Sequence, residues 1–108
     1  MRIVMIGAGY VGLVSGACLS EFGHEVVCVD NDPARIEALK DGIIPIYEPG
    51  LDEVVIANMR AGRLSFTADL SHAVRKAEAV FIAVGTPTRR GDGHADLSFV
   101  FQAAKEIA

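Results

Sequence analysis

Residues 2–12 read RIVMIGAGYVG, a short apolar run that breaks into the pattern Gly-x-Gly-x-x-Gly. In a strand–turn–helix unit, Gly7 allows a tight turn, Gly9 lets a pyrophosphate approach the backbone, and Gly12 lets the helix pack closely. The first amides of the helix carry the positive end of its dipole, so they bind phosphate without a basic side chain. The stretch therefore predicts a dinucleotide site.

The next residues supply the context that a glycine pattern alone lacks. Residues 13–22 are compatible with a helix that Gly23 ends, and residues 25–29 read EVVCV as a buried strand. Asp30 follows this strand, about 20 residues beyond the glycines, where a carboxylate accepts hydrogen bonds from ribose and disfavours the 2′-phosphate of NADP. The context favours NAD binding over glycines that serve only a turn. Arg35 could reach the 2′-phosphate of NADP, contact the ribose or phosphates of NAD, or lie in solvent, and the presence of Asp30 favours NAD.

The rest of the chain alternates strands and helices, which indicates a parallel sheet with helices on both faces. Right-handed crossovers order the strands third, second, first, fourth. The predicted fold class is therefore α/β, with a Rossmann-type doubly wound parallel sheet of strand order 3-2-1-4. The further predicted elements are a helix opened by Asp32–Pro33 and closed by Gly42, a helix over 51–61, a strand over 64–67, a helix from Asp69 to Lys76, a strand over 79–84 and a helix over 97–108 capped by Asp96.

Ligands of such sheets bind where the strand order reverses, here between the first and fourth strands. The loop after the fourth strand reads Gly-Thr-Pro-Thr over residues 85–88. This places Gly85 and Thr86 beside the cofactor, although a simple turn is the alternative interpretation. Residues 89–94 are polar and rich in glycine, which predicts a loop at the mouth of the site.

The composition argues against several classes of protein. With 51% hydrophobic and 22% charged residues and a formal net charge of −4, the chain has no electrostatic footprint for nucleic acid. No apolar run approaches the roughly 20 residues of a membrane span, and the first strand is too short for a signal peptide. We therefore expect a cytoplasmic protein.

The cysteines and histidines show no spacing typical of metal ligands. Cys18 and Cys28 fall on predicted core elements, so we expect both thiols to be buried. His24 and His72 are expected at the surface, whereas His94 belongs to the loop that flanks the cleft. We expect no metal site.

Several motifs together resemble the N-terminal domain of the UDP-glucose 6-dehydrogenases, in the UDP-glucose/GDP-mannose dehydrogenase family. The resemblance covers essentially the whole chain, and neither YEPGL nor VGTP is a general feature of dinucleotide-binding folds. Tyr47 favours a UDP-glucose enzyme over a GDP-mannose enzyme. The motifs are GAGYVG at 7–12, VD at 29–30, IYEPGL at 46–51, GRL at 62–64, VGTP at 84–87 and ADLS at 95–98.

The resemblance implies a four-electron oxidation of UDP-glucose to UDP-glucuronate with two NAD⁺, through a cysteine-linked thiohemiacetal and thioester. Arg35 stands where the family commonly has lysine, and Phe99 where it commonly has tyrosine. The matching positions would all serve the cofactor: Gly7, Gly9, Tyr10, Val11 and Gly12 at the pyrophosphate, Asp30 at the ribose, Arg35 on the adenosine side, and Gly85 and Thr86 in the loop nearer the nicotinamide.

The family's catalytic cysteine and the lysine, asparagine and aspartate that assist it lie in segments outside residues 1–108. We therefore expect these residues to be an N-terminal NAD-binding domain that catalyses nothing alone, within a full-length protein that forms a homo-oligomer. GDP-mannose 6-dehydrogenase, another NAD-dependent dehydrogenase and a non-catalytic nucleotide-sensing module remain alternatives. The roles of Glu48 and His94 stay open.

Overall fold

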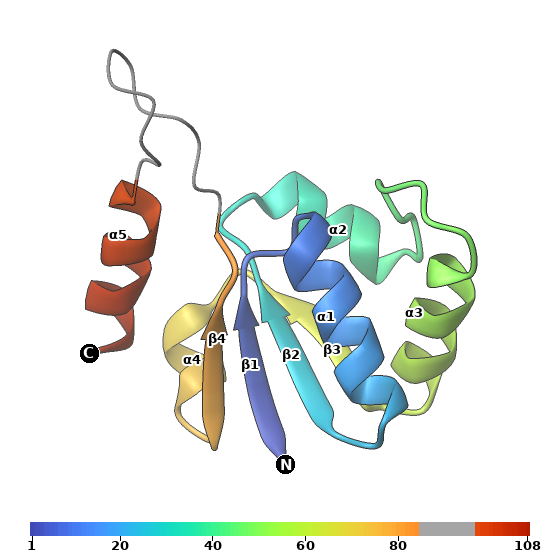
Figure 1. Ribbon diagram of the computed structural model, residues 1–108, viewed down its shortest axis with the longest axis horizontal. Coiled ribbons are helices and arrows are strands. Elements are labelled where there is room, and N and C mark those ends of the chain that lie inside the picture. The colour runs from blue at the N-terminus through green and yellow to red at the C-terminus, as the bar shows by residue number, and fades with distance from the viewer. Residues whose placement is uncertain (85–96) are drawn as a thin grey trace.

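The computed structural model describes residues 1–84 and 97–108, which form a four-stranded parallel sheet with helices on both faces (Figure 1). The strand order is β3-β2-β1-β4, so the predicted fold class and strand order are confirmed. The elements are β1 (Arg2–Ile6), α1 (Tyr10–Glu21), β2 (Glu25–Val29), α2 (Pro33–Lys40), α3 (Leu51–Arg60), β3 (Leu64–Thr67), α4 (Leu70–Val74), β4 (Ala79–Ile82) and α5 (Ser98–Ile107).

The sheet register brings the carboxyl ends of three strands to one edge. Ile6 at the end of β1 lies opposite Val29 of β2 and Ile82 of β4. The chain therefore leaves all three strands side by side, and the glycine turn, Asp30 and the residues after β4 meet there. The observed register explains why residues far apart in sequence form one site.

The core has two layers, one on each face of the sheet. Along β1, Ile3 and Met5 face the helices α1, α2 and α3, whereas Val4 and Ile6 face α4 and α5. This alternation follows from the two-residue period of a strand, and both sets are buried because a parallel sheet is covered on both faces. The first layer is the larger one, and it holds the glycine turn against the start of α1.

Several helix ends follow the predicted capping residues. Asp32 caps α2 by accepting hydrogen bonds from the backbone amides of Ala34 and Arg35, and Asp69 caps α4 through the amide of His72. These carboxylates satisfy amides that have no partner inside the helix. Leu97 occupies the cap position of α5, and the predicted cap residue, Asp96, lies outside the described residues.

Some predicted boundaries were wrong by two or three residues. Helix α1 begins at Tyr10 rather than at residue 13, because Gly9 already accepts the first helical hydrogen bond from the Leu13 amide. Helix α4 ends at Val74, short of Lys76, and β4 ends at Ile82 rather than at Val84. Strand β4 therefore ends at the same level as β1 and β2.

The prediction for the two cysteines was right for Cys28 and wrong for Cys18. Cys28 on β2 is fully buried, and burial raises the pKa of its thiol to about 12. Cys18 is exposed, because α1 turns Gly16 and Ala17 toward the sheet and places the next residue on the outer side of the helix. Among the histidines, His72 is exposed as predicted and His24 is half-buried.

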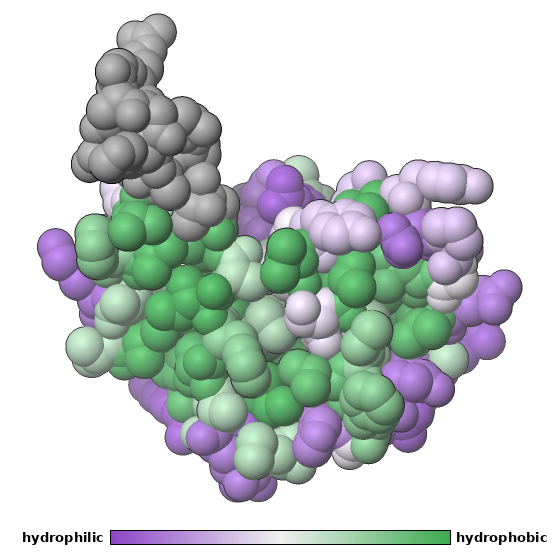
Figure 2. Space-filling view, viewed as in Figure 1, coloured by the Kyte–Doolittle hydropathy of each residue, from purple (hydrophilic) through white to green (hydrophobic). Residues whose placement is uncertain are grey.

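The surface of the described part of the chain is mixed in polarity. On the face seen in Figure 2, apolar residues gather over β4, between α1 and α5, and the β4 side chains Phe81 and Ile82 are exposed. None of the helices within residues 1–84 and 97–108 is long and apolar enough to cross a lipid bilayer.

Candidate functional site

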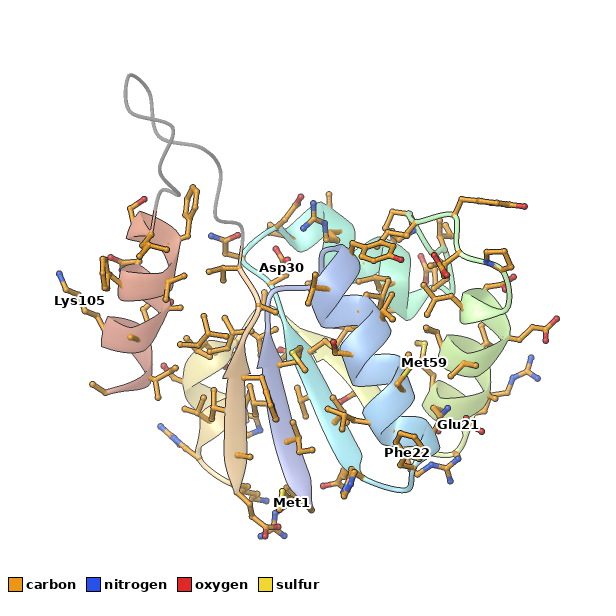
Figure 3. All side chains as sticks on the ribbon, in the orientation of Figure 1. Met1, Glu21, Phe22, Asp30, Met59 and Lys105 are labelled. Carbon is orange, nitrogen blue, oxygen red and sulfur yellow. The ribbon has the colours of Figure 1, made fainter. Side chains whose placement is uncertain are left out.

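A cavity of about 590 Å³ opens at the carboxyl ends of the strands, where β1 lies between β2 and β4. This is the point at which the strand order reverses, the place predicted from the sequence for a ligand. In Figure 3 the labelled Asp30 lies at this edge of the sheet, and Met1 lies at the opposite edge. The lining residues are Ile6, Gly7, Gly9, Val29, Asp30, Asn31, Arg35, Ala68, Leu70, Ala83, Val84, Phe99, Gln102, Ala103 and Glu106.

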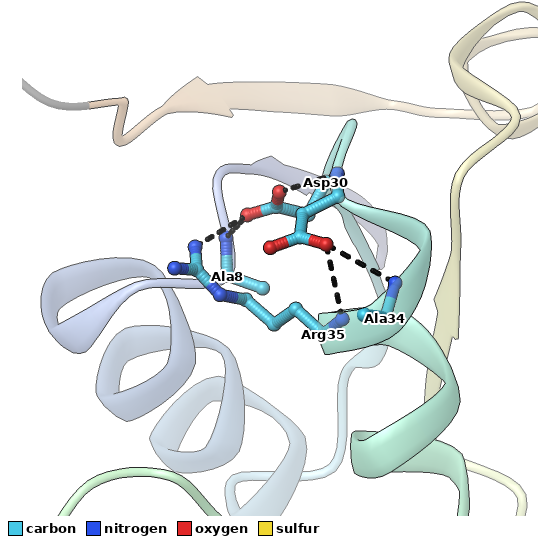
Figure 4. A network of polar contacts seen from close by, with 5 residues as sticks. Ala8, Asp30, Ala34 and Arg35 are labelled. Carbon is cyan, nitrogen blue, oxygen red and sulfur yellow. Dashed lines mark hydrogen bonds and ion pairs between the residues drawn. The ribbon is translucent and has the colours of Figure 1, made fainter.

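The Asp30 carboxylate is the buried polar centre of this cavity. It is only 8% exposed, and Oδ2 accepts hydrogen bonds from the Ala8 amide at 2.9 Å and from Arg35 Nη1 at 3.1 Å (Figure 4). Its Oδ1 accepts a third bond, from the Asp32 amide at 3.0 Å. A carboxylate offers about four acceptor positions, so one remains open while Arg35 is in place. The side chain is therefore fixed in position and already neutralised by a cation.

The turn between β1 and α1 is built around two glycines that the fold itself requires. Gly7 has a φ of +105°, and a Cβ placed on it would lie 2.5 Å from the carbonyl oxygen of Ala83. A Cβ placed on Gly12 would lie 1.8 Å from the carbonyl oxygen of Gly7. Side chains are thus excluded at both positions by backbone atoms, which confirms a tight turn and a close approach of α1.

Gly9 differs from these two glycines because it faces open space. A Cβ placed on it would meet no atom of the described residues within 4 Å. Gly9 is also the N-cap residue of α1, where no side chain of the described residues caps the helix and the first turn carries no acidic residue. The positive end of the helix dipole and its first amides are therefore accessible to an anion beside Gly9.

The structure brings most of the predicted cofactor residues together. Gly7, Gly9, Asp30 and Arg35 line the cavity, and Gly12 supports the turn from below. Tyr10 and Val11 are 55% and 63% exposed and do not line the cavity; they follow Gly9 at the start of α1. Gly85, Thr86 and the predicted loop at 89–94 lie outside the described residues.

Helix α5 contributes a wall of the cavity that the sequence analysis did not identify. Phe99, Gln102, Ala103 and Glu106 line the cavity from this helix. Their spacing of three, one and three positions is typical of one face of a helix, and this periodicity could have identified them. Phe101, on another side of the same helix, is 61% exposed and does not line the cavity.

A hydrogen bond joins the glycine loop to the chain between α2 and α3. The hydroxyl of Tyr10 donates to Glu48 Oε2 at 3.0 Å, and this bond and the negative charge of Glu48 raise the pKa of Tyr10. The sequence offers both residues but no signal that pairs them, since they lie 38 positions apart. Among residues 1–84 and 97–108, no group of three His, Cys, Asp or Glu side chains could hold a metal ion.

Comparison with known proteins gives one consistent family. The model of the UDP-glucose/GDP-mannose dehydrogenase family, NAD binding domain, matches residues 1–108. A UDP-glucose 6-dehydrogenase of Rhizobium meliloti is 67% identical over 100% of this chain and 25% of its own length. UDP-glucose 6-dehydrogenase TuaD of Bacillus subtilis is 52% identical over 98% of this chain and 23% of its own length.

Solved structures agree with the sequence relatives. The crystal structure of a GDP-mannose dehydrogenase from Pseudomonas aeruginosa, a ternary complex, superposes with a TM-score of 0.94 at 42% identity over 99% of this chain and 24% of that chain. A UDP-glucose dehydrogenase from Pyrobaculum islandicum superposes with a TM-score of 0.92 at 42% identity, over 98% of this chain and 24% of that chain. The chain thus spans about a quarter of the length of the relatives that it matches.

Proposed function

Because this chain belongs to the UDP-glucose/GDP-mannose dehydrogenase family as its NAD-binding domain, we propose that it serves an enzyme that oxidises UDP-glucose to UDP-glucuronate with two NAD⁺. The two curated relatives described above, at 67% and 52% identity, are both named UDP-glucose 6-dehydrogenases, which supports this substrate. A GDP-mannose dehydrogenase has the same fold at 42% identity, so GDP-mannose is the second candidate.

One observation carries the assignment of the cofactor site: the uncapped start of α1 and the Asp30 carboxylate open on the same cavity. NAD needs an anion site for its pyrophosphate and acceptors for its ribose hydroxyls, and these two features supply them. The space beside Gly9 leaves room for a phosphate against the backbone. The residues present therefore fit the adenosine half of NAD.

Each predicted residue has a defined contribution in this proposal. The backbone at Gly9, Tyr10 and Val11 binds the pyrophosphate, while Gly7 and Gly12 shape the turn. Asp30 accepts hydrogen bonds from the ribose, and Gly85 and Thr86 contact the cofactor nearer the nicotinamide. When bound, NAD supplies the hydride acceptor, and this domain orients it.

Arg35 acts as the counter-ion of Asp30 in this proposal. Its guanidinium lies 3.1 Å from Asp30 Oδ2, and its side chain is 41% exposed, so it can swing away without leaving a buried cavity. Two ribose hydroxyls need two acceptor positions, and displacement of Arg35 opens the second one. The guanidinium then lies on the adenosine side, beside the ribose and phosphates.

The nucleophile of the reaction belongs to the part of the protein outside these residues. Cys28 is buried with a thiol whose pKa is raised to about 12, and Cys18, although exposed, does not line the cavity. A thiol with a raised pKa is a poor nucleophile at neutral pH. We propose that the full-length protein is a cytoplasmic homo-oligomer and that residues 1–108 alone catalyse nothing.

The test is NADH absorbance of the full-length protein supplied with NAD⁺ and either UDP-glucose or GDP-mannose. The proposal requires two NADH per UDP-glucose, none from GDP-mannose and none from the 108-residue chain used as a control. Turnover of GDP-mannose alone would reassign the substrate. Binding of NAD with no NADH from either sugar would favour another dehydrogenase or a nucleotide-sensing module.

A further inference from the structure

The hydrogen bond between Tyr10 and Glu48 joins two segments that meet only in the folded chain. Tyr10 is the first residue of α1 and directly follows Gly9, the open glycine of the cofactor loop. Glu48 belongs to the connection between α2 and α3, and its Oε2 lies 3.0 Å from the Tyr10 hydroxyl oxygen. Glu48 therefore contacts the side chain of a residue whose backbone starts the anion-binding helix.

The backbone on either side of Glu48 is anchored to the rest of the domain. Ile43 donates from its amide to the carbonyl of Ala38 at 2.9 Å, and Ile44 and Ile46 pack against the larger core layer. After Glu48, the amide of Leu51 donates to the Glu48 carbonyl at 3.0 Å, and the Leu51 side chain is buried. The connection is therefore anchored on both sides of Glu48, whose own side chain is exposed.

The chemistry of the pair suits a lasting tether. The phenol of Tyr10 is protonated at neutral pH and is therefore a donor, and the hydrogen bond and charge of Glu48 raise its pKa further. Tyr10 is 55% exposed, so the bond to Glu48 restrains a side chain that is only partly packed.

We propose that Glu48 is a positioning residue for the cofactor: it holds the Tyr10 side chain to the α2–α3 connection and keeps the approach to Gly9 clear. This inference rests on the NAD site proposed above. Once released, the ring is free to sample rotamers in the open space next to Gly9, where the pyrophosphate would lie. The first helical residue, whose amide faces that phosphate, is also less ordered. Loss of the bond therefore lowers the affinity for the cofactor and leaves the rate of the chemical step unchanged.

The experiment uses the full-length protein and three variants: Glu48→Ala, Glu48→Gln and Tyr10→Phe. Because this bond is exposed to solvent, Glu48→Ala and Tyr10→Phe should each weaken NADH binding only about 2- to 5-fold in a fluorescence titration. The KM for NAD⁺ should rise by the same factor, with kcat and the KM for the sugar nucleotide unchanged. Glu48→Gln keeps an acceptor oxygen and should bind NADH within about twofold of the unchanged protein.

The matched control is Glu53→Ala, which removes the same kind of side chain from an exposed position in the first turn of α3. It should leave NADH binding unchanged, and a thermal melt should show that all the variants are folded at the temperature of the titration. The Tyr10→Phe/Glu48→Ala double variant should bind NADH no more weakly than either single variant, since both substitutions remove the same hydrogen bond.

Three results would overturn the proposal. They are unchanged NADH affinity in Glu48→Ala, equal losses in Glu48→Gln and Glu48→Ala, and additive losses in the double variant. The NADH titration does not depend on the sugar substrate. If the unchanged protein failed to oxidise UDP-glucose, the proposed function would be contradicted. The NADH titration of the variants would still test the role of Glu48.

Discussion

Replacing Gly12 with alanine tests whether the cofactor loop is held by direct backbone contact with α1. A Cβ on Gly12 would lie 1.8 Å from the carbonyl oxygen of Gly7 and 2.8 Å from its carbonyl carbon. The carbonyl would have to retreat by more than 1 Å before the Cβ–oxygen distance reached even 3.0 Å. Gly7 cannot move away easily, because its amide donates a hydrogen bond to the Val29 carbonyl at 2.7 Å. The side of Gly7 on which a side chain would project also lies against the backbone of Ala83.

The magnitude follows from two opposing effects. Overpacking in a well-packed region costs about 1–3 kcal/mol, and more where backbone rather than a side chain must move. Alanine in a helix gains up to about 1 kcal/mol over glycine, which offsets part of that cost. We therefore expect Gly12→Ala to lower the free energy of unfolding by about 2 kcal/mol or more, a large share of the total stability of a small domain.

The matched control is the same substitution three residues earlier. A Cβ on Gly9 would meet no atom of the described residues within 4 Å, and its φ of −77° suits alanine. Gly9→Ala should lower the unfolding free energy by no more than about 1 kcal/mol, the loss of a favoured N-cap residue. It should instead weaken NAD binding, because the methyl group points into the space that a phosphate needs.

Urea denaturation followed by far-ultraviolet circular dichroism, together with NADH titration, separates the two variants. Gly12→Ala should lose stability, whereas Gly9→Ala should stay folded with reduced cofactor affinity. If Gly12→Ala unfolded at the same urea concentration as the unchanged protein, the close contact with Gly7 would be refuted. If Gly9→Ala bound NADH normally, the pyrophosphate would have to lie elsewhere.

Three further perturbations probe the carboxylate, the helix packing and the buried thiol. Asp30→Ala should weaken NAD binding by up to about 100-fold and narrow the preference for NAD over NADP, since a hydrogen bond to a charged group contributes at most about 3 kcal/mol and the displacement of Arg35 offsets part of it. Titration with both cofactors checks this, and unchanged affinities would mean that Asp30 does not face the ribose. Asn58→Ala should cost about 2–4 kcal/mol of unfolding free energy in urea without altering NADH affinity, because buried Asn58 accepts a hydrogen bond from Arg63 Nε at 3.0 Å and lies away from the cavity. Burial raises the pKa of the Cys28 thiol from 9.0 to about 12, so its contribution to the free energy of unfolding is complete below pH 9 and falls by about 1.4 kcal/mol per pH unit between pH 9 and 12. Cys28→Ala should remove this decrease. A thiol reagent at pH 8 should label Cys18 but not Cys28.

The fold could be predicted from the sequence because its signals are local or follow from chirality. The apolar run before Gly7 and the acid at Asp30 mark two strand ends directly. The order of the strands then follows from right-handed crossovers. Asp32 and Asp69 cap helices through amides two or three residues away, within the span that a local pattern describes.

The error at Cys18 shows where a local pattern gives too little information. Helix α1 is apolar on several sides, and Val11 is 63% exposed, so hydrophobicity alone does not indicate which face is buried. Small residues mark that face instead. A Cβ on Gly16 would lie 2.8 Å from Cys28 Sγ, so α1 approaches β2 more closely there than a larger residue would permit.

The site shows a different limit, since the sequence predicted its glycine turn, Asp30 and Arg35 but neither the α5 wall nor most of the contacts between side chains. Asp30 was predicted as an acceptor for ribose, yet in the folded chain it already accepts three hydrogen bonds, one of them from Arg35. These bonds reduce the net free energy gained when ribose binds, because the ribose hydroxyls must replace the charged Arg35 as well as water. They also keep the carboxylate in one orientation, which lowers the entropy lost on binding. Cofactor affinity therefore depends on how readily Arg35 leaves, a property of the contact between Asp30 and α2 that neither residue shows in the sequence.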